Sequence, residues 1–305
     1  MKITFLGTGA GKPTPLRNVS AVALTLNALK QTHWLIDCGE ATQHQILKST
    51  IKVSRIDRIF ITHLHGDHLF GLPGLLSSRA MLSIKRKMTV YGPVGIKSYL
   101  ESVLDISAGY LDYPLDVVEI TDEGELFSED GFTVSVVKLN HRITCFGFII
   151  QQHANKSRLN IPRLEEDNIE RGPLWGMIEK GRVIELDDGR RIYSNKYLLA
   201  PVKGKKVAIF GDTEPVYTLA EQINGADLLI HEATYEAAFI EKALERGHST
   251  THQAAQLAKL GAVKRLAITH LSPRYSQIEG QRLCDECKEI FSNTLLAEDF
   301  LTIEI

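Results

Sequence analysis

The chain has 305 residues, enough for one large α/β domain or two smaller ones, because domains commonly hold about 100–200 residues. With 44% hydrophobic and 24% charged residues and a mean hydropathy of −0.07, the composition excludes a disordered, collagen-like or coiled-coil chain. The net charge of −2 gives nucleic acid no overall attraction, so a polyanion would need a local basic patch.

Apolar runs in the chain are short. Ile59–Ile61 and Phe146–Ile150 fall well below the ~20 residues of a membrane span, and the N-terminus is typical of a strand entering a glycine turn rather than of a signal peptide. We therefore expect a cytoplasmic protein with no membrane association. The four cysteines are too few for a disulfide framework, and Cys284 and Cys287 lack a second pair to complete a zinc site, so we expect them to be reduced.

Strand signals and glycine turns alternate along the first half of the chain. The predicted strands and helix before residue 63 are Ile3–Leu6, Ala21–Leu26, Trp34–Gly39, the helix Glu40–Lys48, and Arg58–Thr62. A polar cluster, His63–His68, follows the last of these strands, and Gly71–Leu76 opens another helix. Further strands are predicted at Met88–Tyr91, Val117–Ile120, Thr133–Leu139 and Cys145–Gln151.

The stretch of about residues 152–206 has a different character, with fewer apolar residues and more glycine, proline and charge. From Gln151 to Lys206 it carries 12 Lys and Arg against 8 Asp and Glu, a net +4 that leaves −6 for the rest of the chain. We expect a flexible insertion that buries little of itself and projects as an arm from a single domain of residues 1–305. Its charge favours contact with a polyanion; a solvated insertion without function is the alternative.

Regular α/β signals return after the insertion. The predicted elements are strands Lys206–Phe210, Asp227–His231 and Arg265–Thr269, helices Thr251–Leu260 and Gln281–Ile290, and a last strand, Phe300–Ile305. Two segments echo earlier ones: Arg265–Leu271 repeats the pattern of Arg58–Leu64, and Ile209–Glu214 that of Leu35–Glu40. Each pair delivers the same residue type, histidine or aspartate, at a strand end. The repetition predicts two similar halves with a site between them.

The sequence His-Leu-His-Gly-Asp-His at residues 63–68 offers four potential metal ligands within six residues. Alternate residues of an extended chain project to one side, so His63 and His65 can bind one ion, while Gly66 allows a turn that presents Asp67 and His68. Imidazole and carboxylate groups suit zinc above all. A polar surface loop with incidental histidines is the alternative.

Three further strand-end residues could complete such a site. Taken singly, His141, Asp212 and His270 would be ordinary core or loop residues. Together they supply what two metals need, since a bridging carboxylate serves two ions roughly 3.5–4 Å apart. We expect one ion on His63, His65 and His141, the other on Asp67, His68 and His270, and Asp212 as the bridge.

These motifs resemble the metallo-β-lactamase superfamily, whose signature is the His-x-His-x-Asp-His of residues 63–68, and more narrowly the short-form ribonuclease Z family of tRNA 3′-processing endonucleases. The matching pieces cover nearly the whole chain: Phe5–Gly9, Pro13–Asn18, Leu35–Glu40, Tyr91–Pro93, Phe210–Thr213, His231–Thr234 and His248–Thr250. The resemblance implies a four-layer αββα sandwich with a projecting exosite arm, corresponding to Pro162–Gly181. It also implies two Zn2+ per subunit, a precursor tRNA substrate, and a homodimer in which one subunit's arm serves the other's site.

The resemblance also suggests roles for individual residues. Asp67 would be the general base, and His248, oriented by Glu232, would protonate the leaving 3′-oxygen. A helix cap at His248–Thr250 is compatible with that role and is the alternative to it. Asp37 is expected to hydrogen-bond a ligand histidine or backbone near the metals, and His231 to support the site rather than bind metal. The candidate substrate contacts are Arg17, Asn18, Thr250, Gly172 and Pro173, with an ordinary surface turn as the alternative for Arg17 and Asn18.

The resulting hypothesis is a zinc-dependent endoribonuclease that removes the 3′ trailer from precursor tRNA, leaving a 3′-hydroxyl on the tRNA and a 5′-phosphate on the trailer. Two alternatives remain. One is a hydrolase with the same metals acting on a small phosphodiester, a thioester or a lactam, for which a basic insertion has no use. The other is a metal-bound RNA-binding or scaffold protein without turnover, for which the set Asp67, Glu232 and His248 has no use.

Overall fold

The computed structural model describes residues 1–29, 31–154, 157–186 and 189–305. Short apolar strands from the N-terminal part, together with the last strand, form a seven-stranded mixed sheet of order β16-β1-β2-β3-β4-β5-β6. Its strands are β1 (Lys2–Gly7), β2 (Ala21–Leu26), β3 (Thr32–Ile36), β4 (Ile56–Phe60), β5 (Met88–Pro93), β6 (Leu115–Ile120) and β16 (Thr302–Glu304). The outer face of this sheet packs on α1 (Thr42–Leu47), α3 (Leu72–Ala80) and α4 (Ile96–Ile106) through one apolar cluster.

A second seven-stranded sheet has the order β15-β14-β13-β12-β9-β8-β7. Its strands are β7 (Gly124–Glu129), β8 (Phe132–Leu139), β9 (Cys145–Gln152), β12 (Lys206–Phe210), β13 (Leu228–Glu232), β14 (Leu266–Thr269) and β15 (Thr294–Leu296). The strands β12 to β15 run parallel. Helices α8 (Thr251–Leu260) and α9 (Gln277–Ile290) cover the outer face, and α7 (Ile240–Arg246) precedes them.

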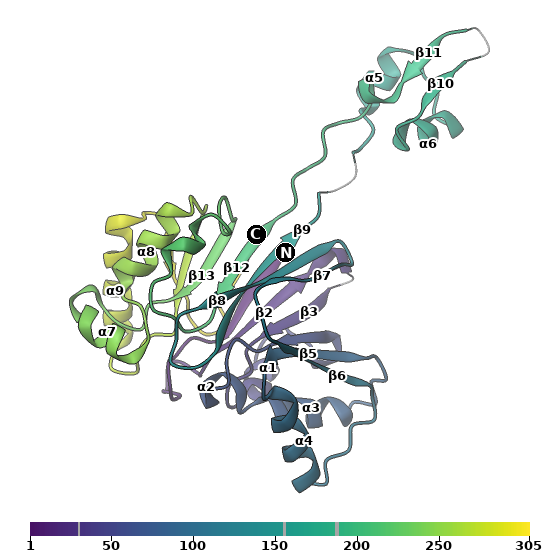
Figure 1. Ribbon diagram of the computed structural model, residues 1–305. Helices are drawn as coiled ribbons and strands as arrows, with labels where there is room; N and C mark the ends of the chain where they lie inside the picture. Colours follow the sequence, from purple (N-terminus) through teal and green to yellow (C-terminus); the bar gives the residue numbers. More distant parts are fainter. Residues whose placement is uncertain (30, 155–156, 187–188) are drawn as a thin grey trace. The chain divides into compact units, whose positions relative to one another are not determined.

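The inner faces of the two sheets meet in an aromatic core. Trp34 of β3 and Phe60 of β4 lie with their ring centroids 5.6 Å apart, and Phe148 of β9 lies 5.2 Å from Phe60. All three side chains are buried, so this layer contributes to the hydrophobic stabilisation of the fold. Helices, sheet, sheet and helices therefore form the four layers of an αββα sandwich, visible in Figure 1, which confirms the predicted fold class.

Some boundaries differ from the prediction. Strand β4 ends at Phe60 rather than Thr62, so two residues separate it from His63. Helix α9 begins at Gln277, four residues earlier than predicted, because the Ser276 side chain accepts a hydrogen bond from the Glu279 backbone and the Glu279 side chain bonds back to the Ser276 backbone in a capping box. Helices α4 and α7 and strands β7 and β15 had not been predicted.

The insertion forms a compact unit of its own, residues Gln152–Gly204, distinct from the unit made of Met1–Gln151 and Lys205–Ile305. It contains α5 (Ile161–Glu166), α6 (Pro173–Glu179) and the hairpin of β10 (Val183–Glu185) and β11 (Arg191–Tyr193). Leu164 and Ile178 are both fully buried in its small core. The expectation that this segment buries little of itself is therefore wrong, because its scattered apolar residues converge from two helices and a hairpin.

None of the helices within the described ranges combines the length and the apolar character needed to cross a bilayer.

Candidate metal centre

Strand ends of both sheets deliver the predicted ligands to one place. After β4 the chain bends at Thr62 and reaches His65, whose backbone is extended. Helix α2 (Gly66–Leu69) then begins, so Asp67 and His68 lie in its first turn. In the second sheet, Asp212 follows β12 by two residues and His270 follows β14 directly, while His141 lies beyond the end of β8. Parallel strands β12 and β14 end at the same sheet edge, which is why residues far apart in sequence meet there.

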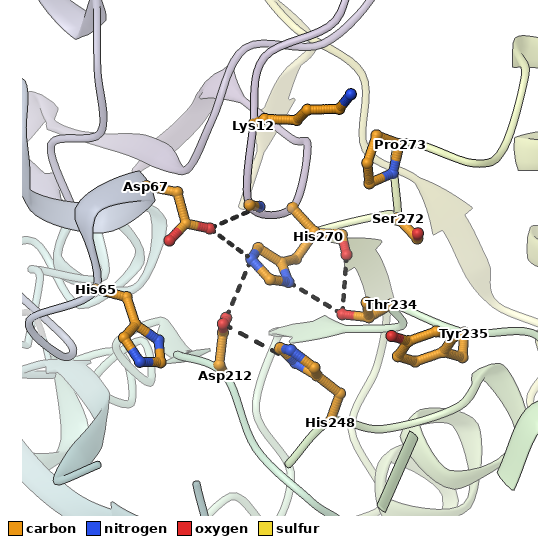
Figure 2. Close-up of a pocket in the computed structure, with 12 residues that line it drawn as sticks. Lys12, His65, Asp67, Asp212, Thr234, Tyr235, His248, His270, Ser272 and Pro273 are labelled. Carbon is orange, nitrogen blue, oxygen red and sulfur yellow. Dashed lines mark hydrogen bonds and ion pairs between the residues drawn. The ribbon is translucent and has the colours of Figure 1, made fainter. Parts of the chain in front are cut away.

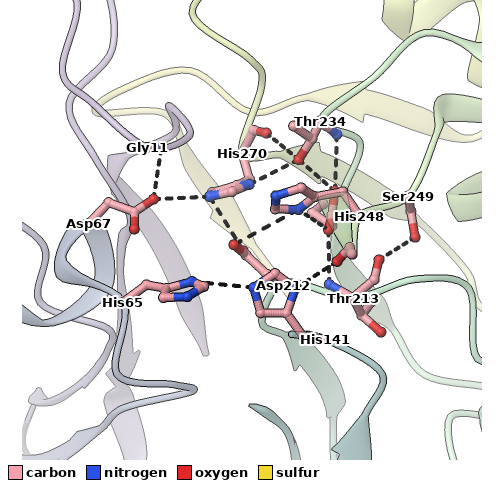
Figure 3. A network of polar contacts seen from close by, with 12 residues as sticks. Gly11, His65, Asp67, His141, Asp212, Thr213, Thr234, His248, Ser249 and His270 are labelled. Carbon is pink, nitrogen blue, oxygen red and sulfur yellow. Dashed lines mark hydrogen bonds and ion pairs between the residues drawn. The ribbon is translucent and has the colours of Figure 1, made fainter. Parts of the chain in front are cut away.

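The ligand atoms form two groups that share one carboxylate. In the first group, Nδ1 of His65 lies 3.1 Å from Nε2 of His63 and 3.3 Å from Nε2 of His141, and Asp212 Oδ2 lies 3.6 Å from His63 Nε2. In each group all ligand atoms lie within 4.8 Å of one another. The side chains of His65, His141 and Asp212 converge in Figure 3.

The second group lies on the other oxygen of Asp212. Asp212 Oδ1 is 3.3 Å from Nε2 of both His68 and His270, and Asp67 Oδ2 is 3.4 Å from His270 Nε2. The seven predicted ligands are thus brought together, with the expected partition and with Asp212 between the groups. A further grouping of Asp212, His248 and His270 is also close enough for an ion.

The donor set fits divalent metals. Ring nitrogens of His68 and His270 face each other at 3.3 Å, and unprotonated nitrogens at that distance attract only through a shared cation or proton. Burial alone would raise the pKa of Asp212, but the surrounding histidines His270, His68 and His63 hold it well below its ordinary value. A buried, ionised carboxylate surrounded by imidazole rings is a donor set that zinc prefers.

The ring nitrogen that points away from the centre has a hydrogen-bonding partner in His63, His68 and His141. Asp37 Oδ2 lies 2.7 Å from His68 Nδ1, and the same carboxylate accepts hydrogen bonds from the backbone N–H and the hydroxyl of Thr62. His63 Nδ1 lies 3.0 Å from the Thr62 hydroxyl, and His141 Nδ1 lies 2.6 Å from the Gly247 carbonyl. These contacts fix the orientation of the three rings and leave Nε2 of each facing the centre. The bond from Asp37 to His68 is the contact expected for Asp37.

An acid–base pair lies beside the ligands. Glu232, fully buried at the end of β13, accepts from His248 Nδ1 at 2.8 Å, from the backbone N–H groups of Thr213 and Thr234, and from the Thr234 hydroxyl. Burial would lower the pKa of His248, but the negative charge of Glu232 raises it to about 9. The imidazole is therefore held protonated by its partner.

A cavity of about 460 Å³ opens onto these groups. Figure 2 shows His65, Asp67, Asp212, His248 and His270 around it, with Lys12, Tyr235, Ser272 and Pro273 at its edge. One contact had not been predicted: the Gly11 backbone N–H donates to Asp67 Oδ2 at 2.7 Å. The alternating glycines Gly7, Gly9 and Gly11 were the available signal, because such a loop can bring backbone N–H groups close to a carboxylate.

Three predicted substrate contacts are not brought to this cavity. The guanidinium of Arg17 is buried and donates to the Thr8 hydroxyl and the Ala297 carbonyl, so it is engaged inside the fold. The Asn18 side chain donates to the Glu40 carbonyl. Thr250 is 1% exposed and caps helix α8, where its hydroxyl accepts from the Gln253 backbone, while His248 still faces the cavity. Each of these three side chains is thus bonded within the fold, and their contact with a substrate stays a prediction.

The other two predicted contacts, Gly172 and Pro173, are exposed at the start of α6 in the inserted unit. His231 is buried beside Glu232, with Nδ1 2.7 Å from the Glu232 carbonyl oxygen, and it belongs to none of the ligand groups found among the described residues. Cys284 and Cys287 are free thiols on the buried face of α9, as expected.

The sequence and the structure were both compared with those of known proteins. Residues 1–158 match the family described as Anti-Pycsar protein Apyc1. The chain is 48% identical over 305 residues to Ribonuclease BN of Proteus mirabilis (strain HI4320), covering 100% of both, and 46% identical over 300 residues to Ribonuclease BN of Erwinia tasmaniensis, covering 98% of both. The structure of human tRNase Z, short form, matches with a TM-score of 0.74 and 34% identity, covering 100% of this chain and 99% of that one.

Proposed function

Since this chain belongs to the ribonuclease BN family, and its residues 1–158 also to the family described as Anti-Pycsar protein Apyc1, we propose that it is a zinc-dependent endoribonuclease acting on precursor tRNA. It removes the 3′ trailer, leaving a 3′-hydroxyl on the tRNA and a 5′-phosphate on the trailer. The observation that carries this proposal is the pair of ligand groups joined by the two oxygens of Asp212, with the pair Glu232 and His248 beside them.

His63, His65 and His141 would hold one ion and Asp67, His68 and His270 the other, with Asp212 shared between them. Two bound divalent ions supply Lewis acidity toward the phosphate oxygens and lower the pKa of water toward ~7. The protein's own contribution is to position a proton acceptor. Asp67, held by the Gly11 N–H, presents a carboxylate that is ionised at neutral pH and can take the proton of the attacking water.

The leaving 3′-oxygen needs a proton, and His248 is placed to give it. Its Nδ1–H is committed to Glu232, so the Nε2–H remains available to the cavity that His248 lines. Glu232 keeps the imidazole charged before the reaction and fixes its plane, because its own two oxygens are both held by other donors.

Substrate choice is assigned to the inserted unit. It carries more basic than acidic residues although the chain as a whole is negative, and RNA binding depends on such local charge. Contacts from its basic and Gly–Pro residues, Gly172 and Pro173 among them, would read the shape and backbone of a folded RNA. We further propose a cytoplasmic homodimer in which the inserted unit of one subunit serves the substrate of the other.

A small-molecule hydrolase with the same metals is the competing function. The match to the family described as Anti-Pycsar protein Apyc1 covers residues 1–158 and therefore only part of the metal centre. The ribonuclease BN relatives match over the full length, which includes the inserted unit, Asp212, Glu232 and His248. That coverage favours a large substrate over a small one.

The test is incubation of a 3′-extended precursor tRNA with zinc-loaded protein, followed by mapping of both product ends. We expect one cut at the 3′ side of the tRNA body, with a 3′-hydroxyl and a 5′-phosphate. Rapid hydrolysis of bis(p-nitrophenyl) phosphate by a protein that leaves the precursor tRNA uncut would support the small-molecule alternative. Tight binding of the precursor without any cut would support the binding protein.

A further inference from the structure

The cavity over the metal centre has one feature that the proposed function does not use. Among the described residues that line it, Lys12 is the one Lys or Arg. Lys12 is exposed, and no ion pair joins it to another residue in the described part of the chain. The larger unit, to which Lys12 belongs, carries a net −4 once the +2 of residues 152–204 is set apart, so its overall charge does not favour RNA. Lys12 is thus a positive charge at the cavity of a unit whose net charge is negative.

The loop that carries Lys12 is tied to the metal ligands at two points. On one side the Gly11 N–H donates to Asp67 Oδ2 at 2.7 Å. On the other, Ala10 N donates to the Leu271 carbonyl and Leu271 N to the Thr8 carbonyl, both at 3.1 Å, and Leu271 directly follows His270. The backbone of residues 8–11 is thus pinned between the two segments that supply Asp67 and His270.

A turn then sets the position of Lys12 itself. Its backbone N–H donates to the Ala10 carbonyl at 2.7 Å, so the residue follows immediately from the pinned segment. Figure 2 shows Lys12 at the edge of the cavity on the same side as Pro273. The lysine side chain has four rotatable bonds, but the backbone from which it extends is held relative to the ligand groups.

We propose that Lys12 is a positioning residue that pairs with a backbone phosphate next to the scissile one. This inference rests on the proposed function, because it takes a polynucleotide as the substrate. A Lys ammonium has three donors and no acceptor, and it binds phosphate as a point charge without reading base identity. A neighbouring phosphate is the group that a polynucleotide would bring to this edge and that a small diester lacks.

The experiment compares Lys12→Gln, Lys12→Arg and the matched control Lys259→Gln, an exposed lysine in the last turn of α8, at the far end of that helix from the cavity. Binding of fluorescent precursor tRNA to chelator-treated protein is measured as a function of salt, and zinc-loaded protein is assayed on both the precursor and bis(p-nitrophenyl) phosphate. We expect Lys12→Gln to weaken RNA binding about two- to fivefold and to lower the salt slope by about 0.7–0.9. Lys12→Arg should restore binding, and Lys259→Gln should leave it unchanged.

A neutral methylphosphonate placed at single linkages on either side of the cleavage site identifies the partner. At the contacted linkage it should weaken wild-type binding as much as Lys12→Gln does, and the two changes together should add nothing further. If Lys12→Gln bound the precursor tRNA as tightly as the wild type, the inference would be overturned while the proposed function stayed intact. An equal loss on bis(p-nitrophenyl) phosphate would also overturn it, by showing that Lys12 acts on the metal centre. A wild-type protein that neither binds nor cuts the precursor would overturn both.

Discussion

His248 Nδ1 lies 2.8 Å from Oε1 of Glu232, while Asp212 Oδ2 lies 3.9 Å from the same nitrogen. The shorter contact is a hydrogen bond and the longer one is not. His248 is thus bonded to a carboxylate outside the two ligand groups, although it is near enough to Asp212 to be considered a ligand itself. Its role as acid or as ligand can be separated by experiment.

We expect His248→Ala to slow the chemical step about 10²–10⁴-fold while the zinc content stays at the wild-type value, because the variant removes a proton donor and no ligand. Single-turnover cleavage and elemental analysis of the same sample check both parts. His252→Ala is the matched control, since His252 lies on α8 with its side chain 41% exposed and pairs with Glu289. Loss of an ion from His248→Ala would make His248 a ligand.

Asp67→Ala should abolish cleavage, by at least about 10³-fold, and leave precursor binding largely intact. The carboxylate is at once the proposed proton acceptor, a neighbour of His270 Nε2 and the acceptor of the Gly11 N–H. RNA affinity comes mostly from charge elsewhere on the protein. Cleavage rate and fluorescence anisotropy measure the two effects, and substantial residual cleavage would assign the proton acceptor to another group.

Asp37→Asn should weaken zinc binding about 10- to 100-fold without removing any ligand. The Asp37 carboxylate bonds His68 Nδ1 and both donors of Thr62, and an amide cannot accept all three. Competition against a chromogenic zinc chelator gives the affinity. Asp122→Asn, at an exposed aspartate that pairs with Lys138, is the control. Unchanged affinity would mean that His68 keeps its orientation without Asp37.

Much of this centre could be predicted because its candidate ligands occur in local sequence patterns. Ligands within residues 63–68 share one loop, and His141, Asp212 and His270 each follow an apolar strand. Arg17 could not be placed in the same way, because its bond to the Ala297 carbonyl depends on packing between distant segments rather than on spacing. The cap at Thr250 is a local pattern, since its partner Gln253 lies three residues further on, and it was among the alternatives predicted for residues 248–250. The same limit applies to the inserted unit: Leu164 and Ile178 are buried in one cluster built from two helices and a hairpin, which composition does not reveal.

Replacing residues 153–203 with a short Gly–Ser linker should weaken precursor binding at least about tenfold. Hydrolysis of bis(p-nitrophenyl) phosphate should persist, because the larger unit stays closed where the linker joins it: Gln151 of β9 pairs directly with Lys206 of β12. Binding and both cleavage assays are measured on the same preparation. An equal fall of both activities would show that the inserted unit supports the fold of the metal centre, and the argument for RNA from its charge would then fail.

The stability of the protein should fall between pH 7 and pH 5 partly because of His33, which is far from the ligands in sequence and buried in β3. Burial, with the nearby charge of Arg55, lowers the pKa of His33 to about 4. Its Nδ1 lies 3.0 Å from the Thr25 hydroxyl, and its Nε2 has no partner among the described residues. The imidazole is therefore accommodated in its neutral form.

The unfolded chain takes up a proton on His33 near its ordinary pKa, whereas the folded chain does so only near pH 4. Stabilisation from the neutral ring is thus fully present above pH ~6.5 and is lost as the pH falls toward 4, which amounts to about 2 kcal/mol between pH 7 and pH 5. His33→Asn keeps a partner for Thr25 and does not titrate, so its urea-unfolding free energy should fall by that much less than the wild type's over this range. Parallel pH profiles for the two proteins would mean that His33 is already protonated in the folded state at pH 5.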